Sequence, residues 1–215
     1  MHYKKFISIL LTLCLCLQPV AVYAHNETED SRYTATVPDK QGYYPLFLDT
    51  VRLMIKSYYT VDTATKYKNA EQTNLYVECV PKVKKEAFQV HYSLYNLEDT
   101  SFDQQIEMDQ KRAKKLEKVF DEDFLDTYTV TIESQPEAET IQVNSKIFTC
   151  FTTTYKADSK EVYQSVYYQK TSCYLDLDAY SLEINITYTG DQKHLPDTKD
   201  LIAVLGGIRI VQLAS

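Results

Sequence analysis

The chain has 215 residues, with 30 acidic and 23 basic side chains and a net charge of −7, which is the size of a single domain. This negative charge disfavours binding to nucleic acid and to anionic lipid headgroups, since both repel an acidic surface. Only four glycines and no tryptophan accompany 19 tyrosines. Scarce glycine disfavours phosphate-cradling loops and long flexible linkers, whereas abundant tyrosine favours ordered β-sheet.

Residues 1–24 have the pattern of a secretory signal peptide. Lys4 and Lys5 precede an apolar run over residues 6–17, and a small-residue cleavage site ends at Ala24. The run is shorter than a stable bilayer span and no second one follows, so we expect no integral membrane segment after signal cleavage. Lipid anchoring through Cys14 or Cys16 is a weaker alternative, because no small residue precedes either cysteine. We expect a secreted or extracytoplasmic protein, in the periplasm or at the cell surface.

The mature chain is expected to begin at His25, with 21 basic and 30 acidic residues and a net charge of −9. Residues 25–32 are polar and acidic and predict a flexible N-terminal tail. Residues 33–215 then form a single α+β domain, which opens with a short strand at 33–37. Apolar residues at helical spacing after Pro45 predict a first amphipathic helix over 45–58, and the polar segment 60–72 predicts a connection.

Two strands and a long helix follow in the sequence. Apolar residues alternate with polar ones over 75–79 and 88–94, which predicts two half-buried strands. Ser101 and Gln104 have the spacing of a helix capping box. Ile106 and Phe120 continue the apolar stripe of a helix over 103–121.

The next 60 residues predict an antiparallel meander. Strands are expected over 128–132, 147–155, 162–168 and 182–188, with hairpin connections at 157–160 and 176–180. Pro196 begins a short final helix, and Gly206 is placed to end it in a left-handed conformation. A last strand is expected from Ile208 to Leu213.

This order of elements predicts an α+β fold in which helices flank an antiparallel sheet. The segments 143–146, 163–168 and 182–188, followed by the final helix and strand, resemble the C-terminal half of PsbP-like domains. The resemblance covers residues 126–213 and rests on element order and tyrosine placement. It implies a PsbP-like α/β/α sandwich that serves as a binding or assembly-factor scaffold rather than an enzyme, and it transfers no functional residue. This chain has Ser145 in a turn where the family often has glycine.

Three cysteines remain after processing, namely Cys79, Cys150 and Cys173. Export to an oxidising compartment predicts one disulfide and one free thiol, and any of the three pairings is open. In a compartment that keeps thiols reduced, all three cysteines are expected to be buried apolar residues, and this alternative has the same weight as a disulfide.

Metal, cofactor and catalytic motifs are sparse. His91 and His194 lack zinc-ligand spacing, and we expect both on the surface. Asp176 and Asp178 fit a hairpin turn better than a calcium loop, because the required third ligand and glycine are missing. The chain contains no P-loop, dinucleotide fingerprint or nucleophile elbow, so we expect no cofactor, and the sequence favours a binding protein over an enzyme.

Two surfaces are candidates for binding. The long helix carries a basic cluster that could meet an acidic partner or a cell-wall polymer. Tyrosines of the meander could form a platform for a carbohydrate or a peptide. The candidate residues are Lys111, Lys114, Lys115, Lys118, Tyr163 and Tyr167.

The leading hypothesis is an exported non-catalytic domain that binds an unknown protein or cell-surface ligand. A small-ligand carrier with an apolar pocket is one alternative. A thiol enzyme that pairs Cys150 or Cys173 with a histidine is the other.

Overall fold

The computed structural model describes residues 34–80, 87–97 and 100–212. The signal peptide and the N-terminal tail predicted for residues 1–32 lie outside the described residues. In chain order the described elements are β1 (Thr34–Ala35), β2 (Tyr44–Leu48), β3 (Val51–Ile55), β4 (Thr60–Lys68), β5 (Gln72–Val80), β6 (Phe88–Asn96), α2 (Phe102–Ala113), η1 (Leu116–Lys118), α3 (Glu122–Thr127), β7 (Tyr128–Ile132), β8 (Glu139–Val143), β9 (Lys146–Ser159), β10 (Ser165–Leu177), β11 (Tyr180–Gly190), η2 (Gln192–His194), α4 (Thr198–Gly206) and β12 (Ile208–Gln212).

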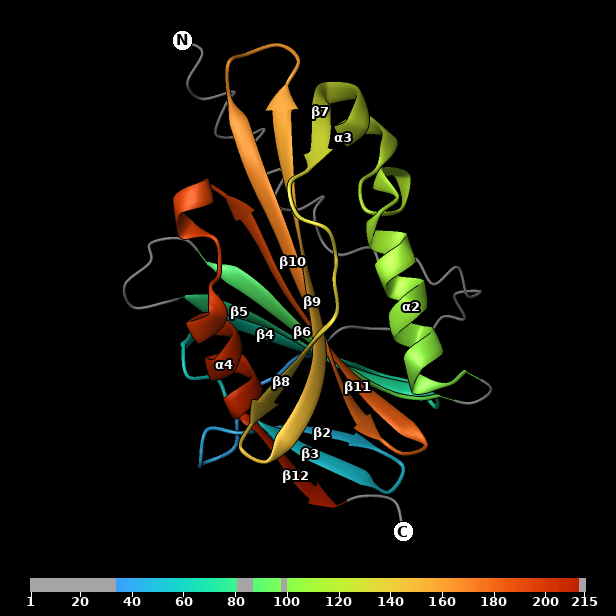
Figure 1. Ribbon diagram of the computed structural model, residues 1–215. Helices are drawn as coiled ribbons and strands as arrows, with labels where there is room; N and C mark the ends of the chain where they lie inside the picture. Colours follow the sequence, from blue (N-terminus) through green and yellow to red (C-terminus); the bar gives the residue numbers. More distant parts are fainter. Residues whose placement is uncertain (1–33, 81–86, 98–99, 213–215) are drawn as a thin grey trace. The chain divides into compact units, whose positions relative to one another are not determined.

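A nine-stranded antiparallel sheet is the main structure of the described chain (Figure 1). Its strands lie in the order β1, β4, β5, β6, β11, β10, β9 and β7, with β8 also paired to β9. The strands predicted at 75–79, 88–94, 128–132 and 182–188 are confirmed. The predicted strand at 162–168 begins only at Ser165, and β8 was not predicted.

Alternation along the central strands gives the sheet one dry face. Leu182, Ile184 and Ile186 on β11 are almost fully buried, as are Val90 and Leu94 on β6. They join a core that also takes residues from β2, β3, β5, β9, β10 and α4. This period of two was readable from the sequence because every second side chain of a strand points to the same face.

The predicted first helix over 45–58 is wrong, because this segment forms the hairpin β2–β3. Leu46 and Leu48 pair across it with Leu53 and Val51 and are buried, so the apolar residues follow a period of two within each strand. Asp49 adopts a positive φ of 47° at the turn. The helical spacing noted in the sequence arose because this turn offsets the two alternating patterns. Strand β12 pairs with β3 and completes a three-stranded sheet.

The connection predicted over 60–72 is also wrong, since β4 occupies most of it and pairs with β5 and β1. Of its nine residues only Ala64 is buried. Because β4 lies near the edge of the sheet and buries so little surface, it lacks the apolar alternation by which strands are recognised in a sequence.

Helix α2 confirms the predicted capping box. The Ser101 hydroxyl accepts from the amide of Gln104, and the Gln104 side chain accepts from the amide of Ser101. The helix ends at Ala113, eight residues earlier than predicted, and the chain continues through η1 and α3.

The predicted final helix and strand are confirmed as α4 and β12, although Gly206 does not end the helix in a left-handed conformation. Gly207 caps it instead, with an ordinary φ of −74°. A Cβ atom on Gly207 would overlap the carbonyl oxygen of Lys56, so glycine is needed there for space.

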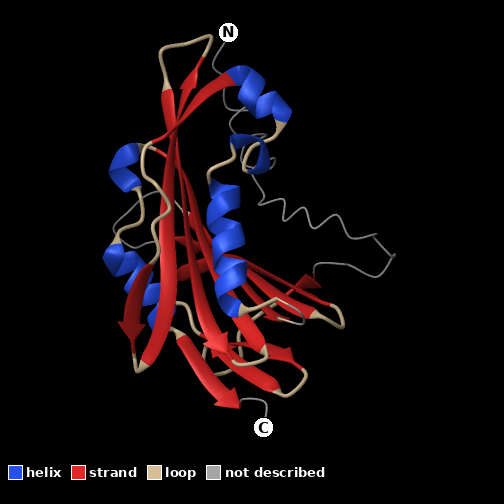
Figure 2. Ribbon diagram, turned by 45° about the vertical axis from the view of Figure 1, so that its right-hand side comes forward, coloured by secondary structure: helices blue, strands red, loops and turns tan. Residues whose placement is uncertain are grey.

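The two longer helices lie on opposite sides of the β9–β11 strands, as Figures 1 and 2 show together. The expectation of an antiparallel sheet accompanied by helices is therefore confirmed. Strand is more abundant than predicted, because β2 and β3 take the place of the first helix and β4 and β8 were not predicted.

Candidate functional site

A basic surface lies over the last turn of α2, the two residues that follow it and η1. Lys111, Lys114, Lys115 and Lys118 are exposed, together with Arg112. Lys111 pairs with Glu107 at 2.6 Å, and Arg112 lies 3.6 Å from Asp109. Within the described residues, Lys114, Lys115 and Lys118 form no ion pair, so three ammonium groups face solvent without a carboxylate partner.

The inner side of α2 is fixed to the sheet. Ile106 packs against Phe151 and Tyr174, whose side chains point away from the main core. The Tyr155 hydroxyl donates to the carbonyl oxygen of Ala113 at 2.6 Å, which satisfies one of the free carbonyls at the helix end. The Tyr174 hydroxyl donates to Asp109 at 2.9 Å. The basic surface therefore lies at the end of a helix that is tied to the sheet through Asp109 and Ala113.

An aromatic cluster holds the segment that follows α2. Phe120 meets the rings of Tyr155 and Tyr168 edge to face at 5.2 and 5.4 Å. It also stacks on Phe124 at 4.8 Å, and Phe124 stacks on Tyr128. Such ring pairs add stabilisation beyond their buried area, so η1 and α3 have their own anchor on β9 and β10.

The two candidate tyrosines do not form one platform. Tyr163 lies in the β9–β10 connection, and its relative accessibility of 114% makes it fully exposed. Tyr167 is half-buried within β10, where it pairs with Lys156 and Gly190. Tyr163 is therefore available for contact with a partner, whereas the Tyr167 side chain is partly enclosed by the sheet.

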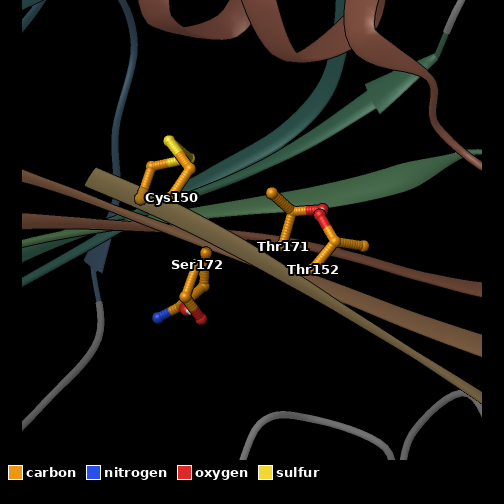
Figure 3. The surroundings of a disulfide bond; sticks show 6 residues. Cys150, Thr152, Thr171 and Ser172 are labelled. Carbon is orange, nitrogen blue, oxygen red and sulfur yellow. Dashed lines mark hydrogen bonds between the residues drawn. A yellow bond between two sulfur atoms is a disulfide. The ribbon is translucent and has the colours of Figure 1, made fainter. Parts of the chain in front are cut away.

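Cys150 and Cys173 are opposite one another on β9 and β10 and form a disulfide, with their Cα atoms 4.1 Å apart (Figure 3). Both are buried in the core, and in this state neither carries the free thiol that the thiol-enzyme hypothesis requires. Cys79 is free and buried. Burial raises the pKa of Cys79 to about 11, which keeps it a thiol at neutral pH.

The opposite face of the central strands is polar, although much of it is buried. Ser172, Asn185, His91 and Tyr76 follow one another in register across β10, β11, β6 and β5. Ser172 donates to the Asn185 side chain at 2.7 Å, on the side of the sheet away from the disulfide (Figure 3).

The expectation that His91 is a surface residue is wrong, since it is only 9% exposed. Its ring stacks on Tyr76 with centroids 4.0 Å apart, and its Nε2 lies 3.0 Å from the Asn74 oxygen. Burial lowers the pKa of His91 to about 3, and the positive charge of nearby Lys170 contributes a smaller part of this shift. The imidazole is therefore neutral at physiological pH. His194 ends η2 and is half-buried.

Two carboxylates lie near Tyr174 at the edge of this polar face. Burial raises the pKa of Glu183, and the proximity of Asp109 raises it further, while Lys170 opposes the shift. Asn185 donates to Glu183 at 2.7 Å, and Gln105 donates to Asp109 at 2.8 Å. Each carboxylate is thus held by a neighbouring amide, which is the usual state of a structural acid under a helix.

Two of the cavities on the described surface lie beside the starts of helices. The larger, of about 370 Å³, lies beside the start of α2 and includes Phe102, Asp176 and Asp178. Asp176 accepts from the amide of Asp178 at 3.0 Å, so the turn predicted for these two residues is confirmed. The smaller cavity, of about 230 Å³, lies beside the start of α4. Its polar residues Glu139, Gln169 and Asp197 were not singled out in the sequence, because they come from three distant elements and share no motif.

Within residues 34–80, 87–97 and 100–212, no three histidine, cysteine or acidic residues converge in a way that could hold a metal ion. Over the same ranges no helix is both long enough and apolar enough to cross a bilayer. Neither a family model nor a curated protein matches the chain.

Proposed function

We propose that the protein is an exported, non-catalytic domain that binds an anionic protein or cell-surface ligand through the basic surface on α2 and η1. The single observation that carries this proposal is the exposed group of Lys114, Lys115 and Lys118. These side chains stand without carboxylate partners among the described residues, in a mature chain whose net charge is −9. A local basic surface on an acidic domain attracts and orients an anionic partner while the rest of the domain repels it.

Three further features support the proposal. Helix α2, which directly precedes these lysines, is fixed to the sheet by Tyr155 and Tyr174, so little backbone order must be gained on binding. Tyr163 offers an exposed ring on the neighbouring hairpin for an accessory contact. Export to the cell surface, expected from the pattern of residues 1–24, would bring the surface to its partner. An α/β/α scaffold of PsbP-like type remains the proposed finer fold.

The proposal is tested with polyanions of known composition. Immobilised poly-L-glutamate and dextran sulfate should retain purified residues 25–215 at low ionic strength and release them as salt is added, because salt screens exposed charges. Changing Lys114, Lys115 and Lys118 together to glutamate should weaken binding by roughly tenfold or more, since exposed charge contacts contribute about 0.5–1 kcal/mol each.

A matched control removes the same total charge elsewhere. Lys40, Lys68 and Lys193 are exposed and lie outside the basic surface. The variant with all three changed to glutamate should still bind within about twofold of the unmodified domain, a difference of about 0.4 kcal/mol, which is less than the contribution expected of one charge contact. Equal loss in both variants would show that overall charge, and not this surface, controls binding, and would refute the proposal.

A further inference from the structure

The small sheet of β12, β3 and β2 has two edge strands, β12 and β2. In an antiparallel ladder, alternate residues of an edge strand turn their N–H and C=O groups toward the partner strand, and the residues between them turn these groups outward. The amide of Lys56 donates to the carbonyl oxygen of Gly207 at 2.9 Å, so Gly207 faces β3. The outward-facing residues of β12 are therefore Ile208 and Ile210.

The outer edge of β2 is closed. By the same alternation its outward-facing residues are Pro45 and Phe47. Pro45 has no N–H to donate, and its carbonyl oxygen accepts a hydrogen bond from the Lys66 ammonium group. That ammonium group also lies 5.9 Å from the centre of the Phe47 ring. Proline and lysine are residues by which natural sheets prevent further pairing at an edge.

The outer edge of β12 is open within residues 34–80, 87–97 and 100–212. Strand β12 pairs only with β3 there, and the outward N–H and C=O groups of Ile208 and Ile210 form no hydrogen bond. Arg209 is exposed, and Val211 is 55% exposed. An accessible edge with unpaired main-chain groups can take up a further strand from another chain.

The outer face of the small sheet is basic. Arg52, Lys56 and Arg209 lie on this face, because the residues that alternate with them are directed to the core. Arg52 lies 5.5 Å from the centre of the Phe47 ring, and Lys56 lies 5.2 Å from that of Tyr43. None of the three cations forms an ion pair with another described residue. In a mature chain with a net charge of −9, this local positive charge favours an acidic partner.

A strand added to β12 would contact the domain on both faces of the small sheet. Its alternate side chains would lie beside Arg209 on the outer face, where carboxylates are favoured. The side chains between them would lie beside Ile210, which is only partly buried against the main core, so apolar groups are favoured. A second copy of β12 would instead bring two Arg209 side chains onto one face, where like charges repel.

We propose that β12 binds an extended segment of a partner protein in which acidic and apolar residues alternate. The segment adds a fourth strand to the small sheet, bonds the main chain of Ile208 and Ile210, and pairs a carboxylate with Arg209. Figures 1 and 2 place β12 and α3 at opposite ends of the described chain. This site is therefore separate from the basic surface on α2 and η1, and it does not depend on the function proposed above.

The test is amide hydrogen exchange of isotopically labelled residues 25–215 with a short peptide of alternating glutamate and valine, blocked at both ends. In the free domain the amides of Ile208 and Ile210 should exchange quickly, whereas the amide of Arg209, which faces β3, should be protected. The peptide should slow exchange at Ile208 and Ile210. The same peptide methylated at its backbone nitrogens cannot donate hydrogen bonds and should bind about tenfold more weakly or worse.

Two further probes separate strand addition from attraction between charges. A peptide of alternating lysine and valine should leave exchange at the two edge amides unchanged, because its ammonium groups would meet Arg209. Poly-L-glutamate should also leave it unchanged, because it has no apolar side chain to pack on Ile210.

Variants assign the charge selectivity to the outer face. Arg209→Glu should weaken binding of the glutamate–valine peptide about tenfold, because repulsion replaces an attractive contact, and the fold should be unaffected since Arg209 is exposed. Lys193→Glu, at an exposed residue of η2, is the matched control and should bind as the unmodified domain does. The triple variant of Lys114, Lys115 and Lys118 should also bind this peptide unchanged.

Four outcomes would overturn the proposal. The two edge amides could be protected without peptide, or no peptide could slow their exchange. The methylated peptide or the lysine–valine peptide could protect them as well as the glutamate–valine peptide does. Finally, Arg209→Glu and Lys193→Glu could bind the peptide equally.

Discussion

His91 shows how far a single side chain depends on its surroundings. The alternation of β6 places it correctly on the polar face, yet sequence gives no measure of how deeply that face is buried. Tyr76 stacks on the His91 ring, and the Asn74 side-chain oxygen is hydrogen-bonded to the His91 Nε2 atom. Both come from β5, which is adjacent to β6 only in the folded sheet. The sequence could therefore predict the face but not the burial.

The buried imidazole should make stability fall in acid. The unfolded chain takes up a proton at His91 near pH 6.5, whereas the folded chain does so only near pH 3, because burial and Lys170 disfavour the charged form. Protons therefore favour the unfolded state between these values, and the free energy of unfolding should decrease as pH falls from 6.5. In His91→Gln this slope should be shallower by up to about 1.4 kcal/mol per pH unit. Urea unfolding between pH 7 and pH 4 measures it, and identical slopes in both proteins would contradict the assignment.

The cysteines give a second prediction at this scale. Peptide mapping of the exported protein without reductant should find Cys150 joined to Cys173, and Cys79 should react with alkylating agents only after unfolding. Reduction should cost about 3 kcal/mol of stability by the chain-entropy relation for a loop of this length. A bridge that includes Cys79 would contradict the structure. The sequence left the pairing open because only the register of β9 and β10 brings two of the three sulfur atoms together.

At the scale of elements, the central strands and the final helix were predictable, and the strands between residues 44 and 68 were not. Strands β6 and β11 alternate cleanly because one face of each is buried in the main core. The hairpin β2–β3 resembled a helix because its two-residue turn shifts the alternation, and β4 lacked a signal because only Ala64 is buried. The alternation of apolar and polar residues therefore does not identify strands that are very short and paired in a hairpin, or strands that lie near the edge of a sheet.

The junction between α4 and β12 gives the prediction for this scale. Gly207→Ala should destabilise the domain by about 1–3 kcal/mol, because its methyl group would overlap the Lys56 carbonyl oxygen of β3's neighbouring turn. Gly206→Ala is the matched control. Its methyl group would lie 3.7 Å from the nearest atoms, so the change should be neutral or stabilising by up to about 1 kcal/mol through helix propensity. Thermal unfolding of both variants compares them, and equal stability would show that the close approach at Gly207 is unimportant.

At the scale of the described domain, the two sides of the sheet have different chemistry. The side facing α4 holds the main core, the disulfide and an acidic cavity, and the side facing α2 holds a buried polar face beneath an exposed basic surface. The basic cluster was visible in the sequence because its lysines lie close together in the chain, within residues 111–118. The cavity was not, because Glu139, Gln169 and Asp197 meet only through the pairing of β8 to β10 and the position of α4.

The proposed function requires that the domain recognises an anionic ligand through Lys111, Lys114, Lys115 and Lys118. A titration of isotopically labelled residues 25–215 with soluble poly-L-glutamate, followed amide by amide, tests this claim most directly. We predict that the largest salt-sensitive shifts fall within residues 111–118, with a smaller effect at Tyr163 and none on α4. Shifts centred on any other face, or an absence of shifts at low ionic strength, would contradict it.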